Sequence, residues 1–368
     1  MQLLVTGSKG FIGQNLLVEL SSNESYTIDS FNRGDSFDAL ESKIFEADAI
    51  IHLAGENRPS DSESFDIGNH QLTKFICEII EKLKKKIPII FSSSIQAEEI
   101  NPYGESKLAA EKVLLELQKR TGCPVSIYRL PGVFGKWSKP NYNSVVATFC
   151  FNIANQLPIQ ISDSNKSIRL VYIDDVIKSF MSTLNCAQVP KKWVSVEPEY
   201  IITLGELANQ LNCFFDSRHT LVSERVGTGL TRALYSTYLS FLAPDQFTYT
   251  IPFFPDERGV FAEVLKTKDS GQFSFFTTLP GVTRGQHFHH SKSEKFFIIK
   301  GQARFRFRNL ITNERFEILV SSDECKVVET IPGWVHDITN VGENEMIAML
   351  WANEIFDRDE PDTISSEV

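Results

Sequence analysis

The chain has 368 residues, of which 42% are hydrophobic and 23% are charged, and its formal net charge is -10. This length is too great for one ordinary hydrophobic core and predicts two domains. The negative charge disfavours nucleic acid as a partner, and no apolar run approaches the roughly 18 residues that a membrane span needs. Strand-like residues follow Met1 directly and leave no room for a signal peptide, so we expect a soluble cytoplasmic protein with a small-molecule partner.

The first part of the chain, residues 1–246, has the pattern of an α/β domain. The short β-rich runs QLLVTG, AIIHLAG, IPIIFSSS and VSIYRL alternate with segments of helical period such as ESKLAAEKVLLELQKR. Such alternation predicts a parallel sheet with helices on both faces, which is a Rossmann-like doubly wound fold.

A glycine-rich turn follows the first predicted strand. Gly7, Gly10 and Gly13 form GxxGxxG in the segment GSKGFIG, so Phe11 and Ile12 lie inside the motif. Glycines at such a turn let backbone amides approach a pyrophosphate at the helix N-terminus, which predicts a dinucleotide site. Taken alone the motif is weak, because a tight glycine turn without a ligand has the same pattern.

The end of the second predicted strand, YTIDSF, bears on the choice of cofactor. Asn32 and Arg33 stand where an NAD enzyme places a carboxylate for the ribose hydroxyls, and arginine suits the 2'-phosphate of NADP. We therefore predict NADPH rather than NADH. Two alternatives stay open: Arg33 is a solvated surface charge, or the nearby Asp29 is the ribose ligand.

The strongest catalytic signal is PYGESK, residues 102–107, preceded by FSSS, residues 91–94. Tyr103 and Lys107 are four residues apart, so on a helix the lysine ammonium lies one turn from the phenol and lowers its pKa. Ser94, at the end of the preceding strand, completes a polar clamp on a substrate carbonyl or alcohol. A lone YxxxK is usually a surface helix pair, but here the glycine turn and the serine accompany it.

Residues 1 to about 235 resemble the extended short-chain dehydrogenase/reductase family of nucleotide-sugar epimerases and reductases. Besides the motifs above, the resemblance includes DAIIHLAG, the segment around Asn69 and RLPGVFG. It implies hydride transfer on a nucleotide-linked sugar, with Asn69 holding a water relay behind the catalytic lysine. It also implies that the cofactor is bound by Gly7, Gly10, Phe11, Ile12, Gly13, Asn32, Arg33, Asp48, Leu53, Ala54, Gly55, Asn69 and Lys107. The alternatives are a helix cap for Asn69 and a turn brace for Asp48.

The same family builds its sugar-nucleotide pocket after the RLPGVFG strand, which makes KWSKPNYNSV, residues 136–145, the candidate substrate loop. In a chain this acidic, a diphosphate must be met by locally placed charges and hydrogen-bond donors. We expect the substrate to be bound by Lys136, Asn141, Asn143, Ser144 and Arg169. An ordinary polar loop is the alternative.

The last part of the chain, residues 247–368, has the pattern of an all-β domain. After Phe254, short runs such as QFSFFTTL, EKFFIIK and EMIAMLW are separated by Gly, Asn and Asp turns. Many short strands within about a hundred residues predict a β-sandwich or a small barrel. The boundary falls within residues 239–259, where prolines interrupt and helical periodicity is lost.

The stretch GQHFHHSKSEKFFIIKG carries three histidines and a glutamate. His287 and His289 alternate along a predicted strand, so both imidazoles point to one face, and Glu294 follows across a turn. Together with His336 they make a donor set for zinc, nickel or iron, of which we expect zinc. The spacing resembles the first motif of the cupin superfamily and implies a jelly-roll barrel, whereas the second motif, around His336, is altered.

A second resemblance suggests another role for His287, that of a catalytic base. DERGVFAEV, residues 256–264, and GVTRGQH, residues 281–287, are similar to segments of the dTDP-4-keto-6-deoxysugar 3,5-epimerases, which are themselves cupins. In those enzymes the histidine that matches His287 is a base, and no metal is required. Whether His287 is a metal ligand or a base, the expected reaction is removal of a proton beside a ketone, because the carbonyl stabilises the enolate that forms. Arg284 and Lys295 are candidate donors to the enolate oxygen.

The order of reductase and cupin, with NPYGESK, GKWSKPNYNSV and YSTYLS, resembles the bifunctional enzymes that make bacterial capsule and O-antigen precursors. The resemblance implies a UDP-linked 4-keto-6-deoxy N-acetylaminosugar as the substrate. The cupin then epimerises C3 of UDP-2-acetamido-2,6-dideoxy-4-hexulose, and the first domain reduces the C4 ketone with NADPH to UDP-2-acetamido-2,6-dideoxy-L-talose. A homodimer is expected, since exposed cupin sheets commonly pair.

Two other functions stay open at this point. In one, the cupin is a structural or dimer-forming module on a plain nucleotide-4-ketosugar reductase. In the other, the N-terminal domain is a non-redox scaffold that binds a sugar nucleotide. Deleting residues 247–368 would leave the product stereochemistry unchanged in the first case, and NADPH would not bind in the second.

Overall fold

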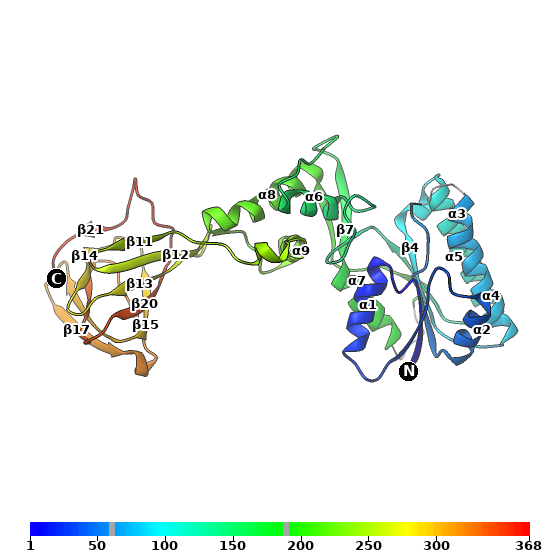
Figure 1. Cartoon of the computed structure of the whole chain (residues 1–368), viewed down its shortest axis with the longest axis horizontal. Coiled ribbons are helices and arrows are strands. Elements are labelled where there is room, and N and C mark those ends of the chain that lie inside the picture. The colour runs from blue at the N-terminus through cyan, green and yellow to red at the C-terminus, as the bar shows by residue number, and fades with distance from the viewer. Residues whose placement is uncertain (59–62, 187–190) are drawn as a thin grey trace. The chain divides into compact units, whose positions relative to one another are not determined.

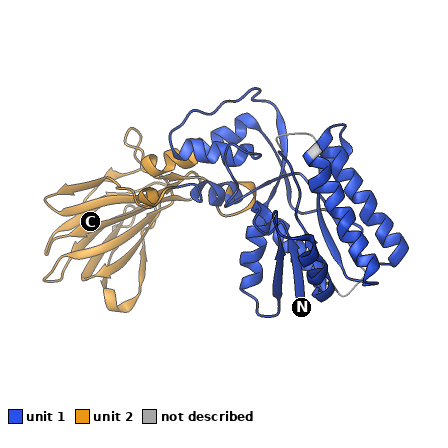
Figure 2. Cartoon of the chain, turned by 45° about the vertical axis from the view of Figure 1, so that its right-hand side comes forward, with its two compact units in different colours: residues 1–211, 232–242 blue, residues 212–231, 243–368 orange. Residues whose placement is uncertain are grey.

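The computed structural model describes residues 1–58, 63–186 and 191–368. These residues form two compact units, which Figure 2 colours separately: residues 1–211 with 232–242, and residues 212–231 with 243–368. The sequence predicts one boundary, between residues 246 and 247. The division differs because the short strand β10 (Val222–Ser223) pairs with β12 (Gly259–Thr267) and so belongs to the second unit.

The first unit is built on a six-stranded sheet with the order β2-β1-β3-β4-β5-β8, in which every neighbouring pair is parallel. The strands are β1 (Gln2–Thr6), β2 (Thr27–Phe31), β3 (Ala49–His52), β4 (Ile89–Ser94), β5 (Val125–Leu130) and β8 (Trp193–Val194). This sheet confirms the Rossmann-like fold that the strand and helix patterns predict. The strand order reverses at β1, so ligands are expected beside the carboxyl ends of β1 and β3.

Helices cover both faces of this sheet (Figure 1). They are α1 (Phe11–Ser21) and α7 (Ile173–Leu184) on one face, and α2 (Phe37–Glu46), α4 (Leu72–Lys82) and α5 (Pro102–Thr121) on the other. The start of α5 is fixed by Asn101, whose side chain accepts a hydrogen bond from the Gly104 amide at 2.8 Å, and by Pro102, which has no amide to satisfy. The cap therefore fixes where the helix presents Tyr103 and Lys107.

The core of the first unit lies between the sheet and α2, α4 and α5. Leu4, Ile50 and Ile127 from the strands are fully buried in one cluster with Ile76 and Leu114 from the helices. Strands buried on both faces are expected to be continuously apolar, which explains runs such as AIIH in β3.

Smaller elements complete this part of the chain. A three-stranded sheet contains β6 (Gly132–Phe134), β7 (Ser167–Tyr172) and β9 (Glu199–Thr203). The remaining elements are α3 (Glu63–Phe65), the π-helical turn η1 (Asp66–Gln71), η2 (Ile95–Glu98), α6 (Val145–Ala154), α8 (Leu204–Thr220) and α9 (Gly229–Leu239). Among the described residues, no helix combines the length and apolarity that crossing a membrane requires.

The second unit contains two sheets of strands, as the sequence predicts, together with the end of α8 and the start of α9. One has the order β10-β12-β13-β20-β15-β18, with β11 beside β12, and the other has the order β17-β16-β19-β14-β21. Their bounds are β11 (Phe253–Asp256), β13 (Gly271–Thr278), β14 (Thr283–Phe288), β15 (Glu294–Lys300), β16 (Gln302–Asn309), β17 (Arg315–Ser321), β18 (Val327–Glu329), β19 (Trp334–Asn340), β20 (Met346–Ala352) and β21 (Ile364–Ser365). The short turns η3 (Pro244–Phe247) and η4 (Ser322–Glu324) complete it. Phe276 and Phe296 from one sheet pack with Phe305 and Ile338 from the other, so the core lies between the sheets.

Candidate active sites

The glycine turn lies between the carboxyl ends of β1 and β3. Gly7 has a φ of 71°, and a Cβ there would lie 2.6 Å from the amide nitrogen of Ala54. A Cβ on Gly13 would lie 2.5 Å from the carbonyl oxygen of Gly7. Glycine therefore lets the turn, the end of β3 and the start of α1 stay in contact. Because Gly10, the N-cap of α1, has no side chain, the first helical amides are left for an anion such as a pyrophosphate.

Asn32 and Arg33 follow β2 at the same edge. Asn32 Oδ1 accepts hydrogen bonds from the Lys9 amide at 3.1 Å and from the Ser8 hydroxyl at 3.2 Å, which ties the end of β2 to the glycine turn. Arg33 is exposed, and its guanidinium pairs with Glu56. The Glu56 side chain is only 13% exposed, so a phosphate that binds Arg33 would have to compete with this carboxylate.

Two nearby carboxylates are engaged elsewhere. Asp29 lies within β2, where its carboxylate accepts from Lys43 at 2.9 Å and from the Gln2 side chain at 3.2 Å. Asp48 precedes β3, and its carboxylate accepts from the Gln2 amide at 2.7 Å. This position is at the amino end of the sheet, opposite the glycine turn. The structure thus corrects the prediction that Asp48 binds the cofactor, and favours its role as a brace.

Ser94, Tyr103 and Lys107 come together at the carboxyl end of β4. Ser94 is the last residue of that strand, and its hydroxyl hydrogen bonds to Tyr103. The ammonium of Lys107 is buried and donates to the Ser92 carbonyl at 3.0 Å. Burial lowers the pKa of Lys107 to about 8, against the opposing effect of Glu111.

The pKa of the Tyr103 phenol is shifted in the direction opposite to the one predicted from the sequence. Burial raises the pKa of Tyr103, and only the hydrogen bond with Ser94 acts to lower it. The four-residue spacing predicts that Lys107 lowers this pKa, but the ammonium is directed to a backbone carbonyl instead. A phenol that keeps its proton suits a proton donor.

Gly55 and Asn69 lie against the same lysine. A Cβ on Gly55 would lie 2.6 Å from Asn69 Oδ1 and 3.0 Å from Lys107 Nζ. Asn69 is buried inside η1, where its amide group donates to the Glu56 carbonyl and the Ser106 hydroxyl, both at 2.9 Å. Asn69 is therefore not a helix cap. π-Helical turns of this kind frequently occur at functional sites.

The other predicted cofactor residues lie at the same edge. Phe11 and Ile12 open α1, and Leu53 and Ala54 directly follow β3. The Ala54 amide donates to the Thr6 hydroxyl at 3.1 Å, which joins the ends of β1 and β3. The structure therefore gathers the predicted cofactor residues, apart from Asp48, around one edge of the sheet.

The two cations predicted to bind substrate are held by carboxylates. Lys136 pairs with Asp174, and Arg169 on β7 pairs with Glu199 on β9. Both pairs are at least partly exposed, so an incoming diphosphate would compete with a carboxylate for each cation.

The polar residues of the substrate loop divide into two groups. The Ser144 hydroxyl caps α6 by accepting a hydrogen bond from the Ala147 amide at 3.2 Å. Its predicted substrate contact must therefore compete with this capping role. Asn141 and Asn143 are exposed, which leaves them suited to meet a ligand.

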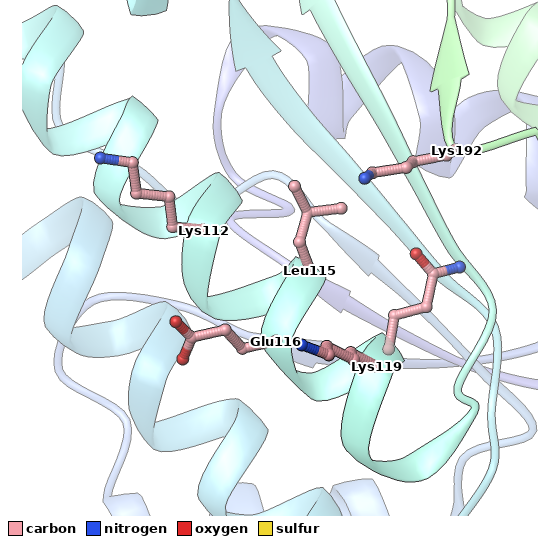
Figure 3. A pocket seen from close by; sticks show the side chains of 6 residues that line it. Lys112, Leu115, Glu116, Lys119 and Lys192 are labelled. Carbon is pink, nitrogen blue, oxygen red and sulfur yellow. The ribbon is translucent and has the colours of Figure 1, made fainter.

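A surface hollow of about 480 Å³ lies along α5 (Figure 3). Among the described residues its lining is Lys112, Leu115, Glu116, Gln118, Lys119 and Lys192. None of these is a predicted site residue, and the polar clamp of Tyr103 and Lys107 belongs to the first turns of the same helix. We assign the hollow no role in the chemistry.

In the second unit, His287, His289, Glu294 and His336 come together. One ligand atom from each lies within 4.8 Å of the others. Glu294 begins β15 in one sheet, while His287 and His336 pair across β14 and β19 in the other. Glu294 Oε2 lies 3.4 Å from Nε2 of both His289 and His336. Ligand atoms about 2 Å from a tetrahedral zinc are about 3.3 Å apart, so these three atoms fit one cation.

The ring nitrogens of the cluster also fit a cation. Nε2 of His287 and His289 and both ring nitrogens of His336 are buried without a hydrogen-bond partner among the described residues. Buried polar atoms normally have partners, so a bound ion would satisfy this set. Burial, and then His336, lower the pKa of His287 to about 4, which leaves its ring neutral at neutral pH.

Glu294 is the acidic centre of the cluster. Burial works to raise the pKa of Glu294, but contacts with His289, His336 and Lys292 hold it well below its ordinary value. The carboxylate is therefore ionised and available as a ligand. Its other oxygen, Oε1, lies 3.1 Å from the buried ammonium of Lys292.

The two cations predicted to meet an enolate oxygen lie in different surroundings. Arg284 is largely buried and donates to the Thr277 carbonyl at 3.1 Å. Lys295 is half-exposed and pairs with Glu329 on the next strand. Of the two side chains, Arg284 is the one that is largely buried, which makes it the better candidate to donate to an enolate oxygen.

Three residues at these sites have no place in the sequence predictions. Glu111 is buried one turn beyond Lys107, and its spacing along α5 is a signal that could have indicated it. Lys292 lies between two predicted ligands in the sequence, although nothing in the pattern shows that it is buried. Asp362 contacts the loop after His289 from 70 to 72 residues away, and no local pattern reveals such a pairing.

Comparisons with known proteins find a matching family model for each of the two parts of the chain. Residues 3–194 match the model of the NAD dependent epimerase/dehydratase family, and residues 254–364 match the polysaccharide biosynthesis C-terminal domain. This chain belongs to the NAD dependent epimerase/dehydratase family. The first match covers more than half of the chain and includes the glycine turn, Tyr103 and Lys107.

Two relatives of this family member match it over its full length. The UDP-2-acetamido-2,6-beta-L-arabino-hexul-4-ose reductase of Pseudomonas aeruginosa is 54% identical over 100% of this chain and 99% of its own. The crystal structure of the capsular polysaccharide assembling protein CapF from Staphylococcus aureus is 40% identical, with a TM-score of 0.92 and coverage of 100% of both chains. The predicted resemblance to capsule-precursor enzymes is confirmed at the level of homology.

A more distant structure shares the fold of the first unit. UDP-glucuronic acid 4-epimerase from Bacillus cereus, in complex with NAD, is similar over 66% of this chain with a TM-score of 0.56 and 17% identity. This likeness supports the Rossmann-like fold alone.

Proposed function

We propose that this protein is a bifunctional enzyme of capsule or O-antigen precursor synthesis. The second unit epimerises C3 of UDP-2-acetamido-2,6-dideoxy-4-hexulose, and the first unit reduces the C4 ketone to give UDP-2-acetamido-2,6-dideoxy-L-talose. The observation that carries the proposal is the meeting of Ser94, Tyr103 and Lys107 beside the glycine turn. The chain is 54% identical over its full length to a reductase of a UDP-linked 4-keto sugar, and this similarity supports the substrate class.

The reduction is assigned to the edge of the parallel sheet. A nicotinamide cofactor bound at the glycine turn would supply the hydride that adds to C4. Ser94 holds the ketone oxygen, and Tyr103 gives its proton to that oxygen as the alkoxide forms. Lys107, buried four residues from Tyr103 on α5, orients the cofactor ribose.

NADPH is the proposed cofactor. Arg33 stands directly after β2, where the adenosine ribose of a dinucleotide lies in this fold, and it is exposed. Asp29, the alternative ribose ligand, is held by Lys43 and the Gln2 side chain. An exposed guanidinium beside an occupied carboxylate favours a cofactor that carries a 2'-phosphate, which would compete with Glu56 for Arg33.

The second unit is proposed to be a cupin that binds a divalent metal. Two facing sheets with three histidines and a glutamate where they meet support this assignment. Zinc suits a donor set of imidazole nitrogens and one carboxylate oxygen. A bound zinc ion would polarise the C4 carbonyl and so make the hydrogen at C3 easier to remove.

His287 is proposed to be the base at C3. Glu294 lies 3.4 Å from both His289 and His336, and these three residues supply the ligands of an open catalytic site. His287 is less buried than the other three residues and its ring is neutral, so it can act as the base once a substrate reaches its buried Nε2. The sequence prediction that His287 is a fourth ligand is the competing assignment.

The two chemistries must run in a fixed order. The hydrogen at C3 is acidic only while the C4 ketone exists, because the carbonyl stabilises the enolate. Reduction removes that ketone, so epimerisation has to come first. Joining both activities in one chain raises the local concentration of the unstable intermediate.

A homodimer is also proposed, and the outer face of one sheet supports it. Phe297 pairs with Met349 on one side and Val327 on the other, and Trp351 pairs with Phe273, which makes an apolar row across four strands. Val327 is 57% exposed. Val327→Lys is expected to shift the protein from dimer to monomer in light scattering, and an unchanged dimer would rule out this face.

NADPH oxidation tests the proposed function. Purified protein is mixed with NADPH and the UDP-linked 4-keto sugar, and the loss of NADPH absorbance is followed. We expect turnover with this sugar and none with the corresponding 4-hydroxy sugar. A failure to bind NADPH would support the non-redox scaffold instead.

A further inference from the structure

The C-terminal tail of the chain lies against the histidine cluster. Its strand β21 pairs with β14, with His287 opposite Ser365 and Phe288 opposite Ile364. The Ser366 amide adds a hydrogen bond to the Gln286 carbonyl at 3.0 Å. The tail therefore extends the sheet beside the strand that carries His287.

Asp362, just before β21, holds the loop that joins β14 to β15. Its carboxylate accepts hydrogen bonds from the amides of His290, Ser291 and Lys292 at 2.8, 2.8 and 2.9 Å. The Ser291 hydroxyl adds a fourth contact at 3.1 Å. Three consecutive amides converging on one carboxylate fix the path of the backbone between the cluster residues on either side.

The same residue also fixes a cluster histidine. The backbone carbonyl of Asp362 accepts a hydrogen bond from Nδ1 of His289. Because Nδ1 then carries the proton, the lone pair of His289 is on Nε2, the nitrogen that lies 3.4 Å from Glu294. The loop held by the carboxylate also leads to Lys292, whose ammonium contacts Glu294 at 3.1 Å.

We infer that Asp362 is a positioning residue that aligns His289 and Lys292 on Glu294 and thereby prepares the cluster for its metal ion. This inference rests on the proposed metal site and adds to it a residue outside the predicted donor set. Groups that hold a ligating histidine through its second ring nitrogen typically change metal affinity by about ten- to a hundredfold when altered.

Metal affinity in variants of the full chain tests this inference. Asp362→Ala removes all four carboxylate contacts, and Asp362→Asn keeps the size but cannot accept from every amide, because one oxygen becomes an NH2 group. The matched control is Asp357→Ala, since among the described residues the Asp357 carboxylate accepts only from the Asp359 and Glu360 amides of the same tail, at 2.9 and 3.4 Å. Each protein is titrated with Zn²⁺ against a chromophoric chelator and with Co²⁺, whose visible absorption reports the ligand geometry.

We expect both Asp362 variants to bind Zn²⁺ about ten- to a hundredfold more weakly, with an altered Co²⁺ spectrum, and Asp357→Ala to match the parent. Asp362→Asn decides the question if Asp362→Ala does not fold. Unchanged affinity and spectrum would overturn the inference even if Tm falls, because a purely structural tail lowers Tm alone.

A second comparison asks whether Asp362 acts through His289. In the His289→Ala background, Asp362→Asn is expected to have little further effect on Zn²⁺ affinity. A loss as large as in the parent would overturn this route. A parent protein that binds neither ion would remove the inference and the metal site together, whereas normal binding without C3 exchange would remove only the proposed epimerisation.

Discussion

In the first unit, the polar side chains at the cofactor edge already have partners within the chain, whereas in the second unit the Nε2 atoms of His287, His289 and His336 have no hydrogen-bond partner among the described residues. Asn69, Lys107 and Ser94 are held in place by hydrogen bonds, and the ligand is left to backbone amides at the glycine turn. The cluster instead offers unsatisfied Nε2 atoms around Glu294.

The difference indicates two ways of preparing a site. A rigid sheet edge with satisfied side chains suits a large ligand that binds through its phosphates. Buried nitrogens around one carboxylate suit a small cation, because a cation can satisfy them all at once. Hydride transfer and proton transfer can therefore be disrupted separately, and each prediction below uses this separation.

The largest effect is expected from Tyr103→Phe. Loss of the phenol proton should slow NADPH oxidation by about a hundred- to ten-thousandfold. Exchange of the C3 hydrogen with solvent deuterium, followed by NMR, should continue at the parent rate. Tyr26→Phe, which changes a phenol bonded to Asn185, is the control for unrelated effects. Loss of exchange in a folded Tyr103→Phe protein would mean that the two activities are not divided between the units.

The opposite result is expected from His287→Asn. C3 exchange should fall by about a hundredfold or more, while reduction of a substrate that already has the inverted C3 continues. The control is His290→Asn, because the ring of His290 packs on Phe288 rather than joining the cluster. Bound zinc, measured by elemental analysis, should remain at the parent level in His287→Asn and be reduced in His289→Asn. Equal loss of zinc would show that His287 is a ligand and not the base.

A smaller effect is expected from Arg33→Ala. Without the guanidinium, the preference for NADPH over NADH, measured as the ratio of kcat/KM values, should fall by about ten- to a hundredfold. Arg120→Ala removes an arginine that pairs with Glu81 elsewhere in the same unit and should leave the ratio unchanged. An unaltered ratio in Arg33→Ala would return Arg33 to the role of a solvated charge.

The sequence predicts best what depends on near neighbours. The glycine turn and the Tyr103 and Lys107 pair were predictable because each is set by spacing along one helix or turn. The fold class of each unit followed from the change between alternating strand and helix patterns and successive short strands. His336 could be predicted from a motif, although the register that brings it opposite His287 could not.

The sequence predicts poorly where a polar side chain finds its partner. Asp48 looks like a site residue until its carboxylate is seen to brace Gln2 at the other end of the sheet. Ser144 and Arg169 are engaged by a helix cap and by an ion pair. Asp362 is far along the chain from the loop it holds. Such pairings depend on tertiary structure, which no local pattern encodes.

The most direct measurement is the deuterium content of the product formed in deuterated water with NADPH. If a proton leaves C3 while the C4 ketone is present and hydride then arrives at C4, the reduced sugar should carry deuterium at C3 and hydrogen at C4, in a single configuration. A reduced product with hydrogen still at C3 would contradict the proposed sequence and leave a plain reductase joined to a second unit of another role.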